Sequence, residues 1–326
     1  MCYFINNQIV GECFLTVSFK KRILFVGMPD MAIICMMKLV EEHVNIVAAV
    51  PPPKNHGTYK LFCDTAYQLD VPVINFENSL KDEDFLEKIR ALDIDLAVVC
   101  SYGKLFPKEF LATAKYGFVN VHPSLLPKYR GGNPYSHVIM NGETETGVTL
   151  HFMDEQFDTG DIIAQAKVYV YENDTMGTLF NRLNFVSAEM LYDLLVRFEK
   201  DVNLPRKPQP KGDFIKAPLL NSNTEDVVIN WNNNCDCIDR FIRALNPFIN
   251  AVTSYRGNFL KIHSATYEKC SVNFEPGTVV SVDKDLSVAC KDGIIKISVL
   301  QAGTYFIGKA SDFIKYSGCT IGEKLE

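Results

Sequence analysis

The chain has 326 residues, of which 47% are hydrophobic and 22% charged, with a net charge of −6 and a pI near 5.6. These are ordinary values for a globular protein, and the length predicts two domains or one large domain with an appendage. The acidic balance argues against a protein whose main task is to coat nucleic acid. Residues from 206 onward are mildly basic but carry no basic stripe.

Ten cysteines are scattered through the chain without a Cys-x-x-Cys pair or a Cys/His zinc spacing. Several lie in apolar runs, as Cys35 and Cys100 do, which is typical of reduced, buried thiols. We therefore expect a cytoplasmic protein with no metal centre. No apolar run is long enough to span a membrane. Residues 1–20 lack the basic start of a secretory signal, and we leave open whether they add a strand or form an extension.

Apolar runs bounded by glycine or polar turns alternate with amphipathic stretches in the first part of the chain. They predict strands at 23–27, 45–52, 71–75, 93–101 and 117–122, and helices at 31–42, 58–69, 81–92, 106–114 and 134–142. This alternation favours an α/β fold with a doubly wound, Rossmann-like, mostly parallel sheet. The first turn has no G-x-G-x-x-G fingerprint, so a dinucleotide cofactor is not implied.

Residues 147–153 and 161–171 look like an antiparallel pair that finishes the sheet, and 174–200 like a long helix capped by Asp174 or Thr175. The stretch 201–217, with three prolines and four basic residues, is typical of a linker. Short β-like runs after the helix predicted at 235–245 indicate a β-rich module. We thus expect a catalytic domain over 1–200, a linker over 201–217, and an open-barrel, OB-like domain over 218–326.

Three polar side chains stand where a purely structural role is unexpected. Asn120 and His122 alternate with apolar residues near the end of a buried strand, and Asp158 lies in a polar turn after another apolar run. The carboxyl ends of parallel strands meet at one edge of a sheet. An Asn, a His and an Asp gathered there suit proton transfer and oxyanion stabilisation.

These residues lie within motifs that resemble the 10-formyltetrahydrofolate-dependent formyltransferases. The motifs occur in order and at the family spacing, at residues 27–30, 102–104, 120–127, 129–131, 145–149, 157–161 and 242–247. The resemblance covers about residues 21–300 and assigns catalysis to Asn120, His122 and Asp158. It implies that an amine attacks the formyl carbon of N10-formyltetrahydrofolate. Asn120 and a protonated His122 would then stabilise the oxyanion, and Asp158 or His122 would take the amine proton. Asp158 beside His122 is expected to favour the imidazolium form.

The resemblance also assigns binding residues. The folate donor is expected to contact the turn after the fourth strand and the loop before Asp158, namely Ser101, Tyr102, Gly103, Lys104, Leu105, Met153, Asp154 and Phe157. The residues assigned to the amine acceptor are Met28, Pro29, Lys128, Arg130, Asn133 and Tyr135. For Lys128 and Arg130, the equal alternative is that they only solvate a loop. For Asn133, capping of the following helix, with Pro134 at its first position, is the stronger interpretation. We interpret His137 and His151 as packing or surface residues and Trp231 as part of the C-terminal core.

The acceptor is the least determined feature. The loop at 51–59 is short and holds one lysine, whereas the tRNA branch usually has a longer basic loop to contact phosphates. Residues 141–151 also look closer to the aminoarabinose branch. These features favour a nucleotide-linked amino sugar as acceptor.

Three alternatives stay open. Residues 27–30 and 102–111 look like the tRNA branch, which keeps initiator Met-tRNA as the principal alternative. A formyltetrahydrofolate hydrolase and a catalytically silent folate-binding module are the remaining ones. The resemblance leaves the oligomeric state open, with a homodimer as one option.

Overall fold

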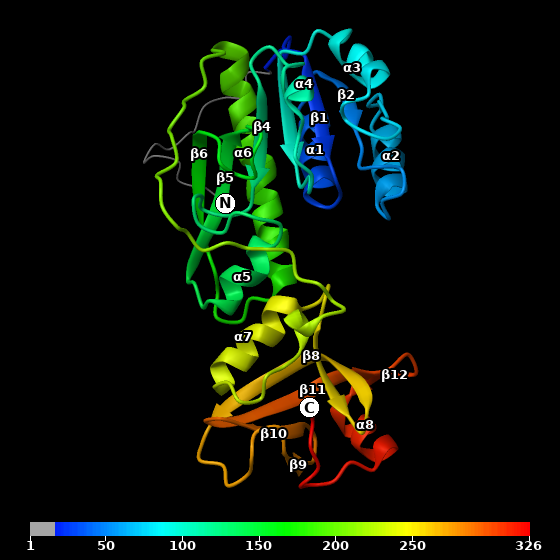
Figure 1. Cartoon of the computed structure of the whole chain (residues 1–326), viewed down its shortest axis with the longest axis vertical. Helices are drawn as coiled ribbons and strands as arrows, with labels where there is room; N and C mark the ends of the chain where they lie inside the picture. Colours follow the sequence, from blue (N-terminus) through cyan, green and yellow to red (C-terminus); the bar gives the residue numbers. More distant parts are fainter. Residues whose placement is uncertain (1–16) are drawn as a thin grey trace. The chain divides into compact units, whose positions relative to one another are not determined.

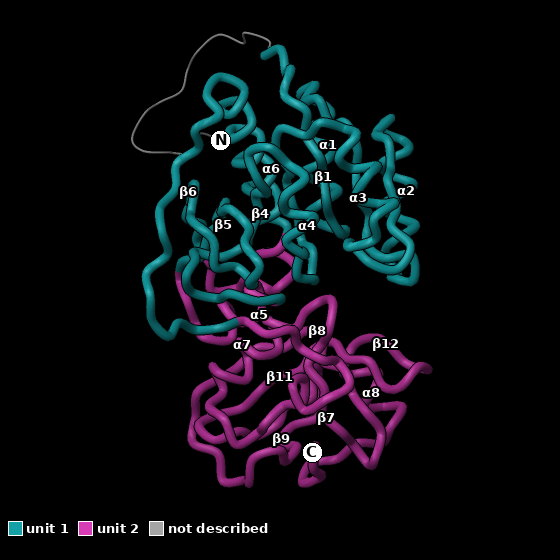
Figure 2. The backbone as a smooth tube through the Cα atoms, turned by 45° about the horizontal axis from the view of Figure 1, so that its top comes forward, with its two compact units in different colours: residues 1–132, 145–169, 181–216 teal, residues 133–144, 170–180, 217–326 magenta. Residues whose placement is uncertain are grey.

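The structure is a computed structural model that describes residues 17–326 (Figure 1). The possible extra strand in the N-terminal extension therefore falls mostly outside the described residues. The chain forms two compact units, shown in different colours in Figure 2. The first comprises the described residues through Gly132 together with Glu145–Tyr169 and Asn181–Lys216, and the second comprises Asn133–Thr144, Val170–Phe180 and Ala217–Glu326.

The first unit is built on a six-stranded sheet with the order β2-β1-β3-β4-β5-β6. The first four strands in that order are parallel, and the last two are antiparallel additions. Their bounds are β1 Ile23–Gly27, β2 Ile46–Val50, β3 Leu96–Cys100, β4 Phe118–His122, β5 Glu145–Phe152 and β6 Ile162–Tyr169. Every residue of β1 and β3 is buried, as expected for parallel strands covered on both faces. The predicted α/β fold is confirmed.

Helices cover both faces of this sheet. Leu24 and Val26 of β1 pack in one cluster with Phe110, on the side of α3 (Glu83–Arg90) and α4 (Lys108–Leu111). Phe25 points the other way and stacks on Phe62, with ring centres 6.5 Å apart. That second face carries α2 (Tyr59–Gln68), the helix that supplies Phe62. The helices α1 (Met31–Glu41) and α6 (Met176–Lys200) contact each other through Lys38 and Glu189, whose charged atoms are 3.2 Å apart. The alternation of side chains along a strand therefore builds two separate apolar layers.

One predicted strand is reduced to a single contact. The run 71–75 pairs with the sheet only through the bridge between Ala49 and Val73. Ala49 exchanges backbone hydrogen bonds with Pro72 and Ile74. Pro72 has no N–H to continue the ladder, which explains why this edge segment does not extend into a strand.

The second unit contains a six-stranded antiparallel sheet with the order β7-β8-β11-β10-β9 and β12 paired to β11. Its bounds are β7 Ala251–Tyr255, β8 Asn258–Lys269, β9 Val279–Val282, β10 Leu286–Cys290, β11 Gly293–Ala302 and β12 Phe306–Lys309. The chain's last residues bridge both edge strands, because Leu325 pairs with Tyr255 and Lys324 pairs with Thr278 just before β9. The tail thus covers edges that would otherwise stay open, which fits the predicted barrel-like module.

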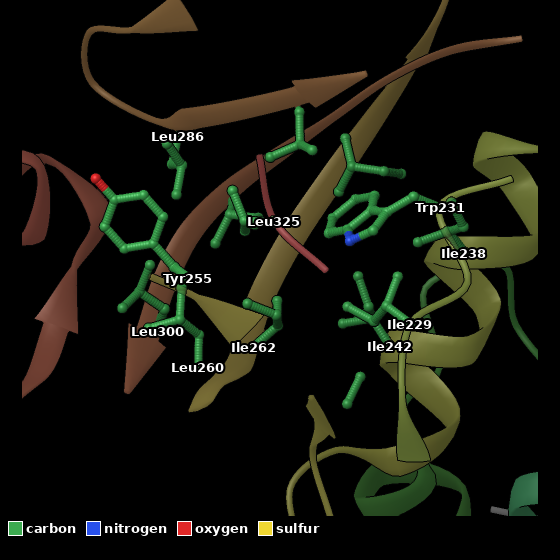
Figure 3. Packing of buried hydrophobic residues seen from close by; sticks show 14 of the residues in the cluster. Ile229, Trp231, Ile238, Ile242, Tyr255, Leu260, Ile262, Leu286, Leu300 and Leu325 are labelled. Carbon is green, nitrogen blue, oxygen red and sulfur yellow. The ribbon is translucent and has the colours of Figure 1, made fainter. Parts of the chain in front are cut away.

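Three helices complete this unit: α5 (Pro134–Met140), α7 (Cys235–Leu245) and α8 (Ala310–Ser317). Trp231 is buried, as predicted, and its indole N–H donates to the Thr253 hydroxyl at 3.1 Å. Figure 3 shows Trp231 beside Ile238 and Ile242 of α7, facing Ile262 of the sheet. The helix therefore supplies one wall of the core and the sheet supplies the other.

The stretch predicted as a linker is bonded along the first unit as far as residue 216. Lys207 and Ile162 exchange backbone hydrogen bonds of 2.8 and 2.9 Å. Further along, the Tyr129 N–H donates to the carbonyl of Ile215 at 2.6 Å. The backbones of Arg130 and Lys216 form an isolated parallel β-bridge. This connection is therefore an ordered strap, which we call the 207–216 strap. Among residues 17–326, no helix is both long enough and apolar enough to cross a membrane.

Gly160, at the end of the Asp158 loop, has no space for a side chain. A β-carbon on Gly160 would lie 1.9 Å from the carbonyl oxygen of Phe152. We predict that Gly160→Ala lowers the free energy of unfolding by about 1–3 kcal/mol, because backbone must move to make room. Urea denaturation of the variant checks this.

Gly57→Ala is the matched control, since a β-carbon there has no heavy atom within 4 Å. It should unfold at the wild-type urea concentration. Equal midpoints for the two alanine variants would contradict the packing argument at Gly160.

Candidate active site

The carboxyl ends of the parallel strands bring together turns that are far apart in the sequence. β1, β3 and β4 are neighbours, so the turns at Met28, Ser101 and Pro123 open at the same edge. The Met28 N–H donates to the carbonyl of Cys100 at 3.2 Å, which ties the first two turns together. The tip of the Met28 side chain lies 4.0 Å from where a β-carbon on Gly103 would stand.

Strand pairing places the predicted polar residues on one face. Asn120 and His122 are two residues apart on β4, and β4 pairs with β5 so that Asn120 lies opposite His151. Residues two apart on a strand, and residues directly opposite on its partner, share a face. The Asn120 amide nitrogen is accordingly 3.1 Å from Nε2 of His151. His151 is buried and lies next to Asn120 and Asp158. Our interpretation of it as a packing or surface residue missed the contact with Asn120. The antiparallel register is the signal that would have revealed it.

Asp158 joins the same group from the loop between β5 and β6. Its Oδ2 accepts the Gly131 N–H at 2.9 Å. Its Oδ1 lies 3.5 Å from Nδ1 of His122, 3.5 Å from the Asn120 amide nitrogen and 3.7 Å from Nε2 of His151. The three residues proposed as catalytic are thus brought together within the first unit.

The hydrogen bonds define how His151 and Asn120 are oriented. Nδ1 of His151 lies 2.8 Å from the carbonyl oxygen of Phe152, so Nδ1 carries the proton. In the neutral ring Nε2 is then an acceptor, and it accepts an N–H of Asn120. The other N–H of Asn120 faces Asp158 at 3.5 Å, the long limit of a hydrogen bond. That second N–H therefore makes only a weak hydrogen bond within the site.

Burial decides the charge of His122. It lowers the pKa of His122 below 6.5, outweighing the opposing effect of the Asp158 charge, while His151 lowers the pKa further. Asp158 favours the imidazolium, as expected, but burial outweighs it because a buried ring loses the hydration that a charge needs, so the expected protonated His122 is not supported. Nε2 of His122 is 2.9 Å from the Tyr129 carbonyl and donates to it, which leaves Nδ1 unprotonated and facing Asp158.

Asp158 remains ionised. Burial by itself raises its pKa, but the charge that His122 carries when protonated, the proximity of His151 and the Gly131 N–H together lower the pKa to about 2. At neutral pH the site therefore holds a carboxylate beside a neutral imidazole. A proton that reaches Nδ1 of His122 would form an ion pair with Asp158.

Two of the residues assigned to the folate donor line an apolar wall, and two others are exposed. Tyr102 and Met153 pack against the apolar cluster on the α3–α4 face. Leu105 and Phe157 leave 49% and 51% of their surface exposed, although both are large and apolar. Ser101 adopts a left-handed backbone with φ 55° at the start of the turn.

The remaining two polar residues of the folate group differ in their roles. Lys104 is exposed. Asp154 accepts hydrogen bonds from the Thr159 hydroxyl at 2.7 Å and from the Gln156 N–H at 2.9 Å. Its carboxylate therefore shapes the loop that carries Asp158.

The residues assigned to the acceptor divide between the two units. Lys128 is exposed, and Arg130 is half-buried in the first unit. Asn133 belongs to the second unit and caps α5 by accepting the Ser136 N–H at 3.3 Å, which confirms its predicted capping role. Tyr135, also in the second unit, packs on Phe180 with ring centres 4.9 Å apart. Pro29 lies in the turn after β1, next to Met28.

A group of potential metal ligands in the second unit has a structural explanation. Cys235, Cys290 and Asp292 lie within 4.8 Å of one another. The Asp292 carboxylate accepts the Cys235 N–H at 2.7 Å, at the beginning of α7. Burial, followed by the nearby Asp292, raises the pKa of the Cys235 thiol to about 12. The group is therefore a helix cap beside buried thiols.

The charge state of His122 can be measured directly. We predict that its pKa lies below 6.5 in the folded protein and falls further in Asp158→Asn, because the carboxylate has the largest raising effect on this pKa. Histidine NMR spectra recorded as a function of pH give both values. A wild-type pKa above 6.5 would show that the ion pair outweighs burial.

Comparison with known proteins identifies the relatives of this chain. The family described as Formyl transferase matches residues 21–195, and the Formyl transferase, C-terminal domain family matches residues 221–317. A methionyl-tRNA formyltransferase of Clostridioides difficile is 34% identical over 287 residues, covering 86% of this chain and 92% of that protein. One from Acetivibrio thermocellus is 36% identical over 288 residues, covering 86% and 91%.

A solved structure shows that the fold is shared more widely. The N-formyltransferase of Helicobacter canadensis, in complex with folinic acid and dTDP-3-aminofucose, has a TM-score of 0.65 at 21% identity, over 87% of this chain and all of that one. The family match over both parts of the chain, together with relatives at this level of identity over most of its length, establishes that the chain belongs to the formyl transferase family and is a formyl-transferring enzyme.

Proposed function

We propose that this enzyme transfers the formyl group of 10-formyltetrahydrofolate to the amine of initiator Met-tRNA. The observation that carries formyl transfer is the contact of Asn120, His122 and Asp158 at the carboxyl edge of the sheet. The acceptor is supported by the relatives, which are methionyl-tRNA formyltransferases matched over most of their length.

This acceptor replaces the nucleotide-linked amino sugar that the short loop at 51–59 favoured. The sugar N-formyltransferase structure is 21% identical and supports the shared fold alone. Compared with a longer basic loop, a short loop with one lysine offers fewer contacts to phosphates at this one place in the chain. Several parts of a chain can supply such contacts, so the loop alone does not determine the acceptor.

Asn120 and His122 divide the chemistry between them. The second N–H of Asn120 is held only weakly by Asp158, so it is free to donate to the oxygen on which negative charge develops. His122 is neutral, and its Nδ1 accepts the proton that the amine loses as the new C–N bond forms. The same proton then passes to the folate nitrogen when its bond to the formyl carbon breaks.

Asp158 supports the proton transfer without taking the proton itself. Its pKa of about 2 makes it a poor base at neutral pH. Its carboxylate instead stabilises the imidazolium as it forms on His122, 3.5 Å away. The low pKa of Asp158 and the lowered pKa of His122 therefore separate their two roles.

The exposed apolar side chains support the position of the folate donor. Leu105 lies in the turn after β3, and Phe157 directly precedes Asp158. Both are large, apolar and exposed, and such residues next to a polar centre are typical of ligand sites. Tyr102 and Met153 supply apolar surface beneath these loops. Such a site suits the flat ring system of a pterin.

Loss of either member of the His122–Asp158 pair should slow turnover. We predict that His122→Asn and Asp158→Asn each lower kcat by about 100- to 1000-fold with 10-formyltetrahydrofolate and the active acceptor. Steady-state kinetics give the result. His43→Asn and Asp64→Asn are matched controls, since both positions are exposed and His43 has a φ of 59° that Asn tolerates. Full turnover by either site variant would disprove the assigned mechanism.

The acceptor requires its own assay. We predict that the enzyme formylates charged initiator Met-tRNA and leaves a panel of nucleotide-linked 3- and 4-amino sugars unchanged. Transfer of a radiolabelled formyl group measures both under identical conditions. Formylation of a sugar without formylation of the tRNA would reverse the proposal.

A further inference from the structure

Gln209 uses its carboxamide nitrogen on the loop that carries Asp158 and its carboxamide oxygen on Arg130. Its Nε2 donates to the carbonyl oxygen of Asp158 at 2.9 Å and to that of Gly160 at 2.8 Å. Its Oε1 accepts a hydrogen bond from the Arg130 guanidinium at 2.6 Å. Gln209 comes from the 207–216 strap, which joins the two parts of the chain and was not expected to contribute to the site. All of these residues belong to the first unit.

These bonds reach Asp158 along two routes. The direct route holds the Asp158 main chain, which adopts a left-handed conformation with φ 55°. A non-glycine residue in that region needs outside support to keep its conformation. The second route runs through Arg130, whose neighbour Gly131 donates its N–H to the Asp158 carboxylate. One side chain therefore fixes the two segments that together aim this carboxylate at His122.

The chemistry of the contact specifies a glutamine. Two carbonyl oxygens need two N–H donors, and the guanidinium needs an acceptor, which a primary amide supplies in one group. Glutamate has no N–H donor, and asparagine is one methylene shorter. The strap itself is anchored on either side of Gln209, by the Lys207–Ile162 pair and the Arg130–Lys216 bridge. The side chain is consequently held over the loop.

We propose that Gln209 is a positioning residue that holds the Asp158 carboxylate and Arg130 in the geometry needed for formyl transfer. The inference rests on the proposed role of Asp158 in that reaction. It assigns to the 207–216 strap a supporting part in catalysis, exerted through Asp158 and Arg130, in addition to its connection of the two units.

The first test is kinetic. Gln209→Met keeps the length of the side chain and removes the amide, and we expect kcat to fall about 10- to 100-fold while KM for the folate donor changes less than about twofold. Gln68→Met makes the same change at an exposed position at the end of α2 and should keep wild-type kinetics. If Gln209→Met does not fold, Gln209→Asn provides the test, with a loss in the same direction. Wild-type kcat in a folded Gln209 variant would overturn the proposal.

A double-mutant cycle separates positioning from general destabilisation. If Gln209 acts through Asp158, Gln209→Met should cost little in a chain that already carries Asp158→Asn. Single-turnover formyl transfer measures the residual rates. Fully multiplicative losses would mean that Gln209 acts independently of Asp158 and would refute the inference.

A measurement without turnover keeps the two proposals distinct. The charged or titratable groups that act on His122 are Asp158, His151 and Arg130, and of these Asp158 has the largest effect. Displacing its carboxylate in Gln209→Met should therefore lower the His122 pKa, as NMR titration against Gln68→Met would show. An unchanged pKa would count against Gln209, whereas wild-type inactivity on every acceptor would refute the proposed function alone.

Discussion

The site depends on an ionised carboxylate kept beside a neutral imidazole in a buried position. Asp158 remains charged at neutral pH because its pKa is about 2, and the hydrogen bond from the Gly131 N–H contributes to that low value. His122 remains neutral because burial outweighs the attraction of Asp158. Either residue alone would be an ordinary buried polar group. In the proposed mechanism, the Asp158 carboxylate, 3.5 Å from Nδ1 of His122, stabilises the imidazolium once His122 has taken the proton.

The surrounding structure maintains that separation. The β4–β5 register aligns Asn120 with His151, so the amide is oriented by a partner that is itself tied to the backbone of Phe152. Gly160 allows the Asp158 loop to return within contact of Phe152. The position of this loop is thus fixed by its contact with the Phe152 backbone and by the hydrogen bonds from Gln209 of the 207–216 strap. Such redundancy is expected where a left-handed residue must keep a fixed side-chain direction.

The main structural feature of the second unit is how the edges of its sheet are covered. Its sheet would expose two edges, and the final residues of the chain cover both by pairing with Tyr255 and Thr278. Helix α7 covers the core around Trp231, as Figure 3 shows. The thiols of Cys235 and Cys290 are buried, which raises the pKa of each, and Asp292 caps the helix by accepting the Cys235 N–H. The packing of this unit is therefore explained by the sheet, by helix α7 and by the residues at the end of the chain.

The sequence by itself determined the α/β architecture, the β-rich second part and the residues proposed for catalysis. Strand and helix periodicities are local, and Asn120, His122 and Asp158 occur in motifs with recognisable spacing. Only the tertiary structure decided the charge of His122, because burial depends on what packs around the ring. It also revealed the contacts of His151 and Gln209. One is fixed by the register of two strands and the other by a chain segment about fifty residues beyond Asp158, and no local pattern specifies such pairings.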